Sequence, residues 1–80
     1  MKFSYQEQKD YESIEGEIAS LEEKISRLDE DILQYSHDFV KLGELTKEKE
    51  NTEKLLEEKM NRWMYLEELA AKIESGETAP

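Results

Sequence analysis

The sequence predicts an all-α fold in which two helices form an antiparallel coiled-coil hairpin. Three observations indicate this fold. Apolar residues recur at alternating spacings of three and four, a capping box precedes the first repeat, and a polar segment interrupts the pattern near the middle. The 80 residues also include only 3 Gly and 1 Pro, so few turn signals are present. We therefore expect one elongated domain with a single turn.

The first helix is expected over residues 5–34, after a lead-in of residues 1–4. Ser4 and Glu7 have the spacing of a capping box, in which each side chain bonds the backbone amide of the other residue. The apolar stripe of this helix repeats over three heptads, which is typical of a coiled-coil seam. Its members are Tyr11, Ile14, Ile18, Leu21, Ile25, Leu28 and Ile32.

A turn is expected at residues 35–38, because Ser36 or Asp38 there can cap a second helix. The alternative is one continuous helix of about 70 residues, roughly 105 Å long, that pairs with a second chain. A parallel dimer of such helices would place Lys49 against Lys49 and Lys59 against Lys59 at the seam. A monomeric hairpin avoids this repulsion and is the favoured arrangement.

The second helix is expected over residues 38–75, and it keeps the heptad spacing less strictly. Three of its seam positions are polar: Lys49, Thr52 and Lys59. The seam residues expected to pack against the first helix include Leu56, Trp63 and Leu66. Gly76 is a typical residue after a helix C-terminus, so residues 76–80 are expected to be a disordered tail.

The turn position also predicts a pairing register. Folding the chain back about Ser36 pairs residues whose numbers sum to about 72. The seam lysines would then meet carboxylates of the first helix, Lys49 with Glu22 or Glu23 and Lys59 with Glu12 or Glu15. The same register places Trp63 beside Tyr11 at the open end. We expect Trp63 to be the most important core residue because of its large apolar area.

The composition and motifs argue against a catalytic function. The chain has 21 acidic and 11 basic residues, a formal net charge of −10 and no cysteine. It lacks the G-x-x-x-x-G-K-[ST] motif of ATP-binding loops, and the single His37 has no catalytic partner, so no enzyme activity, cofactor or metal site is expected in this chain. Uncharged apolar runs long enough for a membrane span or signal peptide are absent, which favours a cytoplasmic location.

Two motifs at the ends of the chain resemble a known family. Residues 3–12 (FSYQEQKDYE) resemble the opening of the C-terminal domain of ABC-F ATPases of the Uup-like branch, and residues 61–69 (NRWMYLEEL) resemble its closing motif. The resemblance covers nearly the whole chain. It implies that the chain is the C-terminal part of a longer ATPase, whose upstream cassettes in the same chain bind ATP and magnesium.

The resemblance implies a binding module that contacts ribosomal RNA, transfer RNA or DNA in translation-related work. The basic residues that are candidates for phosphate contact are Lys9, Lys24, Arg27, Lys47 and Arg62. The acidic excess of the chain favours an alternative, because surfaces that bind duplexes usually have a basic excess. In this alternative the coiled coil binds another protein or oligomerises, with no nucleic acid involved.

Overall fold

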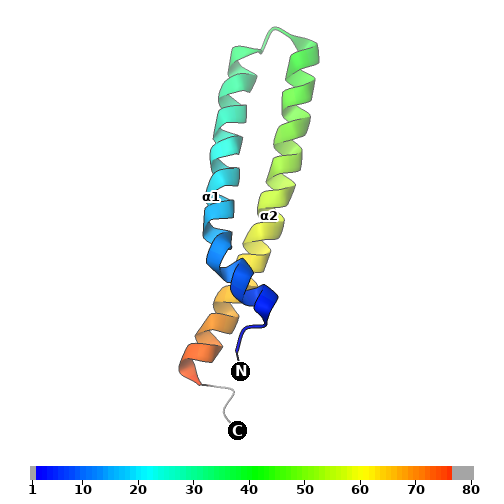
Figure 1. Cartoon of the computed structure of the whole chain (residues 1–80). Coiled ribbons are helices and arrows are strands. Elements are labelled where there is room, and N and C mark those ends of the chain that lie inside the picture. The colour runs from blue at the N-terminus through cyan, green and yellow to red at the C-terminus, as the bar shows by residue number, and fades with distance from the viewer. Residues whose placement is uncertain (1, 77–80) are drawn as a thin grey trace.

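The computed structural model describes residues 2–76, which form an antiparallel pair of helices (Figure 1). Helix α1 spans Tyr5–Gln34 and helix α2 spans Phe39–Ser75, and the pair measures 63 × 17 × 14 Å. The described residues contain no strand, so the prediction of an all-α hairpin is confirmed. Residue 1 of the expected lead-in and residues 77–80 of the expected tail lie outside the described residues.

Helix α1 begins with the capping box. The Glu7 amide donates to Ser4 Oγ at 3.2 Å, and the Ser4 amide donates to Glu7 Oε1 at 2.9 Å. Glu7 also accepts a 2.6 Å hydrogen bond from the hydroxyl of Tyr65 on α2. The Ser4 amide, and after it the Tyr65 hydroxyl, stabilise the carboxylate and lower the pKa of Glu7 below its ordinary value. One ionised side chain therefore both caps α1 and ties it to α2.

This arrangement predicts that hairpin stability depends on the ionisation of Glu7. Because the pKa of Glu7 is lower in the folded than in the unfolded chain, its stabilisation is complete above the unfolded pKa and is lost as the pH falls through the folded pKa. Gln at this position keeps the capping geometry without the charge. We expect Glu7→Gln to lower the melting temperature near pH 7, and the difference from the parent chain to shrink towards about pH 3.

Thermal melts followed by far-ultraviolet circular dichroism measure this difference. Glu50→Gln is the matched control, since Glu50 is an exposed carboxylate of α2 that makes no ion pair among the described residues. It corrects for removing one charge from a chain of net charge −10. A Glu7→Gln effect that is equal at both pH values, after this correction, would contradict the prediction.

The turn between the helices is closed by backbone hydrogen bonds and a side-chain cap. The Tyr35 amide donates to the Asp31 carbonyl at 2.9 Å, and the Asp38 amide donates to the Tyr35 carbonyl at 3.0 Å. The Lys41 amide donates to Asp38 Oδ1 at 3.1 Å, so Asp38 rather than Ser36 caps α2. Helix α2 therefore begins at Phe39, one residue after the expected start.

Packing between the helices follows the heptad positions. The buried residues are Ile14, Leu28, Leu45, Thr52 and Leu66, and the half-buried seam residues include Tyr11, Ile18, Leu21, Ile25, Leu56 and Trp63. The buried Thr52 hydroxyl donates to the Glu48 carbonyl at 2.8 Å, so this polar seam position is satisfied within α2. Ile14 and Leu66 are the most deeply buried large side chains. The packing core is thus narrow and is densest towards the open end.

The seam lysines meet carboxylates of α1, but the expected partners were wrong. Lys49 pairs with Asp29 instead of Glu22 or Glu23, and the Lys59 ammonium lies 2.9 Å from Glu17 instead of near Glu12 or Glu15. Both observed partners lie closer to the turn. A lysine at the seam must extend its aliphatic stem past the edge of the interface to bring its ammonium group into water. The ammonium group therefore meets a carboxylate at the end of this stem and not the residue directly opposite on α1.

Two aromatic rings pack together at the open end. The ring packed against Tyr11 is that of Phe3, with centroids 5.1 Å apart. The Tyr11 hydroxyl donates to Glu67 on α2 at 3.3 Å. Burial, and after it the nearby Glu67 carboxylate, raises the pKa of Tyr11. Trp63 lies over Ile18 and its neighbours in a groove described below. Over the residues described, neither helix has an apolar stretch that could cross a lipid bilayer.

Candidate nucleic-acid interface

The two sides of the seam differ in chemistry. On α1, Glu17, Lys24 and Asp31 flank the seam at heptad positions g, whereas Glu15 and Glu22 flank it at positions e, on the opposite side. We call the first side the mixed-charge side, whose lining includes Glu17, Lys24, Arg27, Asp31, Lys41, Glu48 and Lys59. We call the second the acidic groove, whose lining includes Glu15, Ile18, Glu22, Ile25, Glu53, Leu56, Glu57, Met60, Trp63 and Met64.

Three cations converge in the half of the mixed-charge side nearest the turn. Lys24 and Arg27 of α1 and Lys41 of α2 line one groove, with Leu28 and Leu45 of the core also lining it. Lys24 lies 3.3 Å from Glu48 across the helix pair, and this ion pair is half exposed. Exposed pairs of this kind contribute little stability and are screened by salt. The cations of this groove are thus available to an incoming anion at low cost.

The remaining candidate cations lie elsewhere. Lys9 and Arg62 are towards the open end, where Lys9 lies over the Tyr5 ring at 5.4 Å and Arg62 pairs with Asp10 at 3.1 Å. A hydrogen bond from Gln6, and after it the Arg62 contact, lowers the pKa of the Asp10 carboxyl. Lys47 is exposed, is not part of the groove of Lys24, Arg27 and Lys41, and makes no ion pair with any described residue. Of the five candidates, the structure brings together only Lys24 and Arg27.

Sequence analysis missed the apolar surface at the turn. Phe39 and Leu33 are 86% and 78% exposed, and Val40 is similarly exposed. Tyr35 is also partly exposed, with the Lys41 ammonium 5.5 Å from its ring centre. The heptad phase could have identified this surface. The seam of α2 starts after Phe39 and Val40, so neither residue is at a seam position, and both point away from the partner helix.

Contacts at the open end join the two segments that carry the family motifs. Residues 3–12 and 61–69 are linked by three pairs of side chains, Glu7 with Tyr65, Asp10 with Arg62, and Tyr11 with Glu67. Tyr65 and Arg62 lie side by side on α2, with the guanidinium 5.2 Å from the ring centre. The two motifs thus form one structural unit that holds the open end together.

A family model described as the ABC transporter C-terminal domain matches residues 2–68 and includes nearly all of this unit. The chain belongs to this family. This ABC transporter C-terminal domain is the type found in ABC-F ATPases. This chain is 40% identical over 74 residues to YfmR of Bacillus subtilis (strain 168), described as an uncharacterized ABC transporter ATP-binding protein. The match covers 92% of this chain but only 12% of YfmR, and no solved structure matches the ABC transporter C-terminal domain described here.

Proposed function

We propose that this domain is the nucleic-acid-contacting arm of an ABC-F ATPase. The observation that supports the proposal is the groove of Lys24, Arg27 and Lys41 close to the exposed Phe39 at the turn. Ribosomal RNA, transfer RNA or DNA is the proposed partner, and the setting is translation in the cytoplasm. The domain acts as a monomer, because its net charge of −10 opposes the association of two copies.

The side chains in this region suit unpaired nucleotides better than a regular duplex. Lys24, Arg27 and Lys41 would contact phosphates, and the exposed ring of Phe39 would stack on a base. Base stacking on one aromatic ring contributes about 1–3 kcal/mol. This stacking compensates for the small number of phosphate contacts, whereas a duplex surface would require a larger basic excess.

In this proposal, the rest of the parent protein, and not this domain, binds ATP and carries out its chemistry. This chain has no G-x-x-x-x-G-K-[ST] motif, so its residues do not fit an ATP and magnesium site. The cassettes of the parent would hold both and would move as the nucleotide changes. The hairpin would carry that motion to the contact between its turn and the nucleic acid.

A salt-dependent titration tests the proposal. The chain is titrated with a single-stranded RNA, an RNA duplex and ribosomal RNA at low and high salt, with fluorescence anisotropy as the measurement. We expect affinity to fall with salt and to be higher for RNA with unpaired bases. The double variant Lys24→Gln and Arg27→Gln should weaken binding and reduce the magnitude of the salt slope by about 1 to 2. Phe39→Ala should weaken binding without changing this slope.

The matched control is the double variant Lys54→Gln and Lys72→Gln, which removes two exposed lysines of α2 that line neither side of the seam. Its effect should be small compared with that of the variant at Lys24 and Arg27. Equal losses in the two proteins would indicate a general charge effect and would contradict a specific contact at Lys24 and Arg27. Affinity that is independent of salt would contradict phosphate contact altogether.

A further inference from the structure

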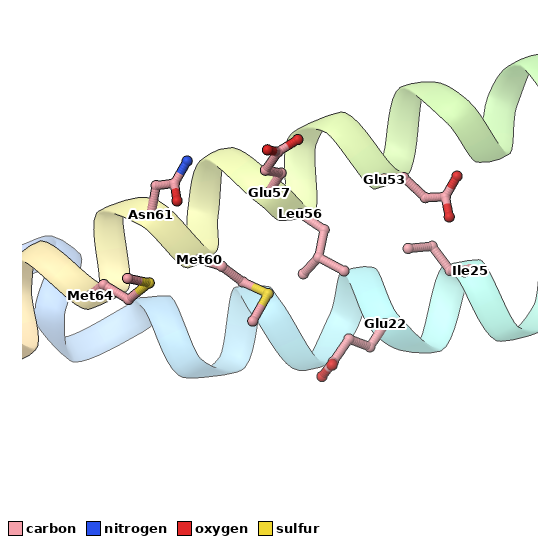
Figure 2. Close-up of a pocket in the computed structure, with 8 residues that line it drawn as sticks. All are labelled: Glu22, Ile25, Glu53, Leu56, Glu57, Met60, Asn61 and Met64. Atoms are coloured by element: carbon pink, nitrogen blue, oxygen red, sulfur yellow. The ribbon is translucent and has the colours of Figure 1, made fainter.

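The acidic groove is an apolar surface that the hairpin leaves uncovered. Figure 2 shows Ile25 of α1 and Leu56 and Met60 of α2 directed into the space between the helices. Met60 and Met64 are 40% and 60% exposed, although both are large apolar side chains. Exposed apolar side chains that gather in one groove mark an interaction site, whereas scattered ones do not.

Carboxylates border this apolar surface on both helices. Glu22 of α1 and Glu53 and Glu57 of α2 lie at its edges in Figure 2, and Glu15 continues the border along α1. The described residues that line the groove include no lysine or arginine, although Lys49, which pairs with Asp29, is close enough to Glu53 to interact with its charge. This charge repels nucleic acid, anionic lipid and a second copy of this acidic chain, and it attracts a cationic partner.

The shape of the groove suits a helix. On α2 the lining runs from Glu53 to Met64, which is about 17 Å at 1.5 Å per residue and equals roughly three turns of an added helix. The part of the groove lined by Ile25, Leu56 and Met64 has a volume of about 660 Å³, and its lining side chains in Figure 2 are spread along the helix pair. The flexible side chains of Met60 and Met64 can adapt to the side chains of a partner helix.

The indole of Trp63 adds a second, polar observation in the same groove. Its Nε1 atom is buried and finds no hydrogen-bond acceptor among the described residues. Trp63 lines the groove next to Ile18, Ala19 and Met60. Buried donors are usually satisfied, so this unpaired donor is an exception. Because the nitrogen is closed off from solvent, a partner in the groove would reach it only if the indole turned.

We propose that the acidic groove binds an amphipathic helix of another protein, with lysine or arginine on either side of its apolar face. The bound helix converts the two-helix pair into a three-helix arrangement and covers Met60 and Met64. The partner's cations meet Glu15, Glu22 and the two glutamates of α2. This site lies on the opposite side of the seam from Lys24 and Arg27. The test of peptide binding is therefore independent of the test of nucleic-acid binding.

Fluorescence of Trp63 provides a direct test, because Trp63 is the single tryptophan of the chain and lines the groove. The probe is a synthetic peptide of about 15 residues without tryptophan, with leucines at helical i, i+3, i+4 spacing and flanking lysines. A second peptide has glutamate in place of each lysine. We expect the lysine peptide to change the emission of Trp63 in a saturable way and to bind at least about tenfold more tightly than the glutamate peptide.

Two matched variants locate the binding site. Met64→Gln replaces an apolar groove side chain with a polar one of similar length and leaves the charge unchanged; the position is 60% exposed, so the fold should persist, as circular dichroism would check. It should weaken binding of the lysine peptide by at least about tenfold. Leu55→Gln makes the same kind of change at a 44% exposed residue on the mixed-charge side and should leave binding unchanged.

Three results would overturn the proposal. The first is equal binding, or no binding, of the lysine and glutamate peptides. The second is a loss of affinity in Leu55→Gln that matches the loss in Met64→Gln. The third is displacement of the bound peptide by single-stranded RNA together with the same change in Trp63 emission, which would assign the groove to nucleic acid instead.

Discussion

Leu66→Ala is expected to unfold most of the hairpin at room temperature. The Leu66 side chain is 0% exposed, and removing a fully buried leucine side chain costs about 2–5 kcal/mol. A small domain without disulfides or metals has little more stability than this, on the order of 3–5 kcal/mol. The adjoining backbone cannot collapse into the space left behind, because α2 is a continuous helix from Phe39 to Ser75.

Urea denaturation followed by circular dichroism measures the change. Leu33→Ala is the matched control, since it removes the same atoms from a leucine that is 78% exposed. The control should shift the free energy of unfolding by no more than about 0.5 kcal/mol. If the two variants denature at the same urea concentration, Leu66 does not have the buried position described here.

Trp63→Ala is also expected to destabilise the hairpin, but Trp63 is not the most important core residue that the sequence indicated, because Leu66 and Ile14 are buried more deeply. Trp63 is half-buried, so we expect a loss near the lower end of the range for buried aromatic residues, about 3 kcal/mol. Trp63 lines one groove together with Ile18 and Ala19 of α1, so its truncation widens the gap between the helices there. Per unit of apolar area removed, the loss of unfolding free energy should be smaller than for Leu66→Ala, because solvent already reaches part of the indole.

Trp63→Phe separates packing from hydrogen bonding. Phenylalanine keeps most of the apolar contact and removes the buried indole N–H, which has no acceptor among the described residues. Leaving a buried donor unpaired costs about 1–3 kcal/mol, so its removal offsets part of the lost area. We expect Trp63→Phe to unfold within about 1 kcal/mol of the parent chain in urea. A loss as large as that of Trp63→Ala would show that the indole nitrogen has a partner in solution.

The features that could be predicted from the sequence are those set by local or periodic signals. The capping box of Ser4 and Glu7 involves residues three apart, so spacing alone specifies its contacts, whereas the cap of α2 was left open between Ser36 and Asp38. The alternation of three and four residues likewise determines which side of each helix faces the other. The sequence also showed that Thr52 is a polar residue at a seam position, but it did not show that the Thr52 hydroxyl donates to the Glu48 carbonyl.

The features that could not be predicted depend on how far long side chains reach between the helices. Lys49 and Lys59 have several carboxylates within reach, and side-chain geometry rather than number along the chain decides among them. The acidic groove depends on the same kind of information. The sequence shows that Met60 and Met64 widen the apolar stripe of α2, but only the pairing of the helices shows that α1 leaves them uncovered.

The hairpin shape also has a mechanical consequence. Helix α1 starts and helix α2 ends at the same end of the molecule, and the turn lies at the other end of a 63 Å long axis (Figure 1). A rigid-body rotation of about 10° at the open end would sweep the turn through roughly 11 Å, the scale of a hinge motion between domains. Both helices are unbroken, so little of this rotation would be absorbed by bending. In such a rotation Phe39 at the turn would travel farthest, and the Glu7–Tyr65 contact near the open end would move little.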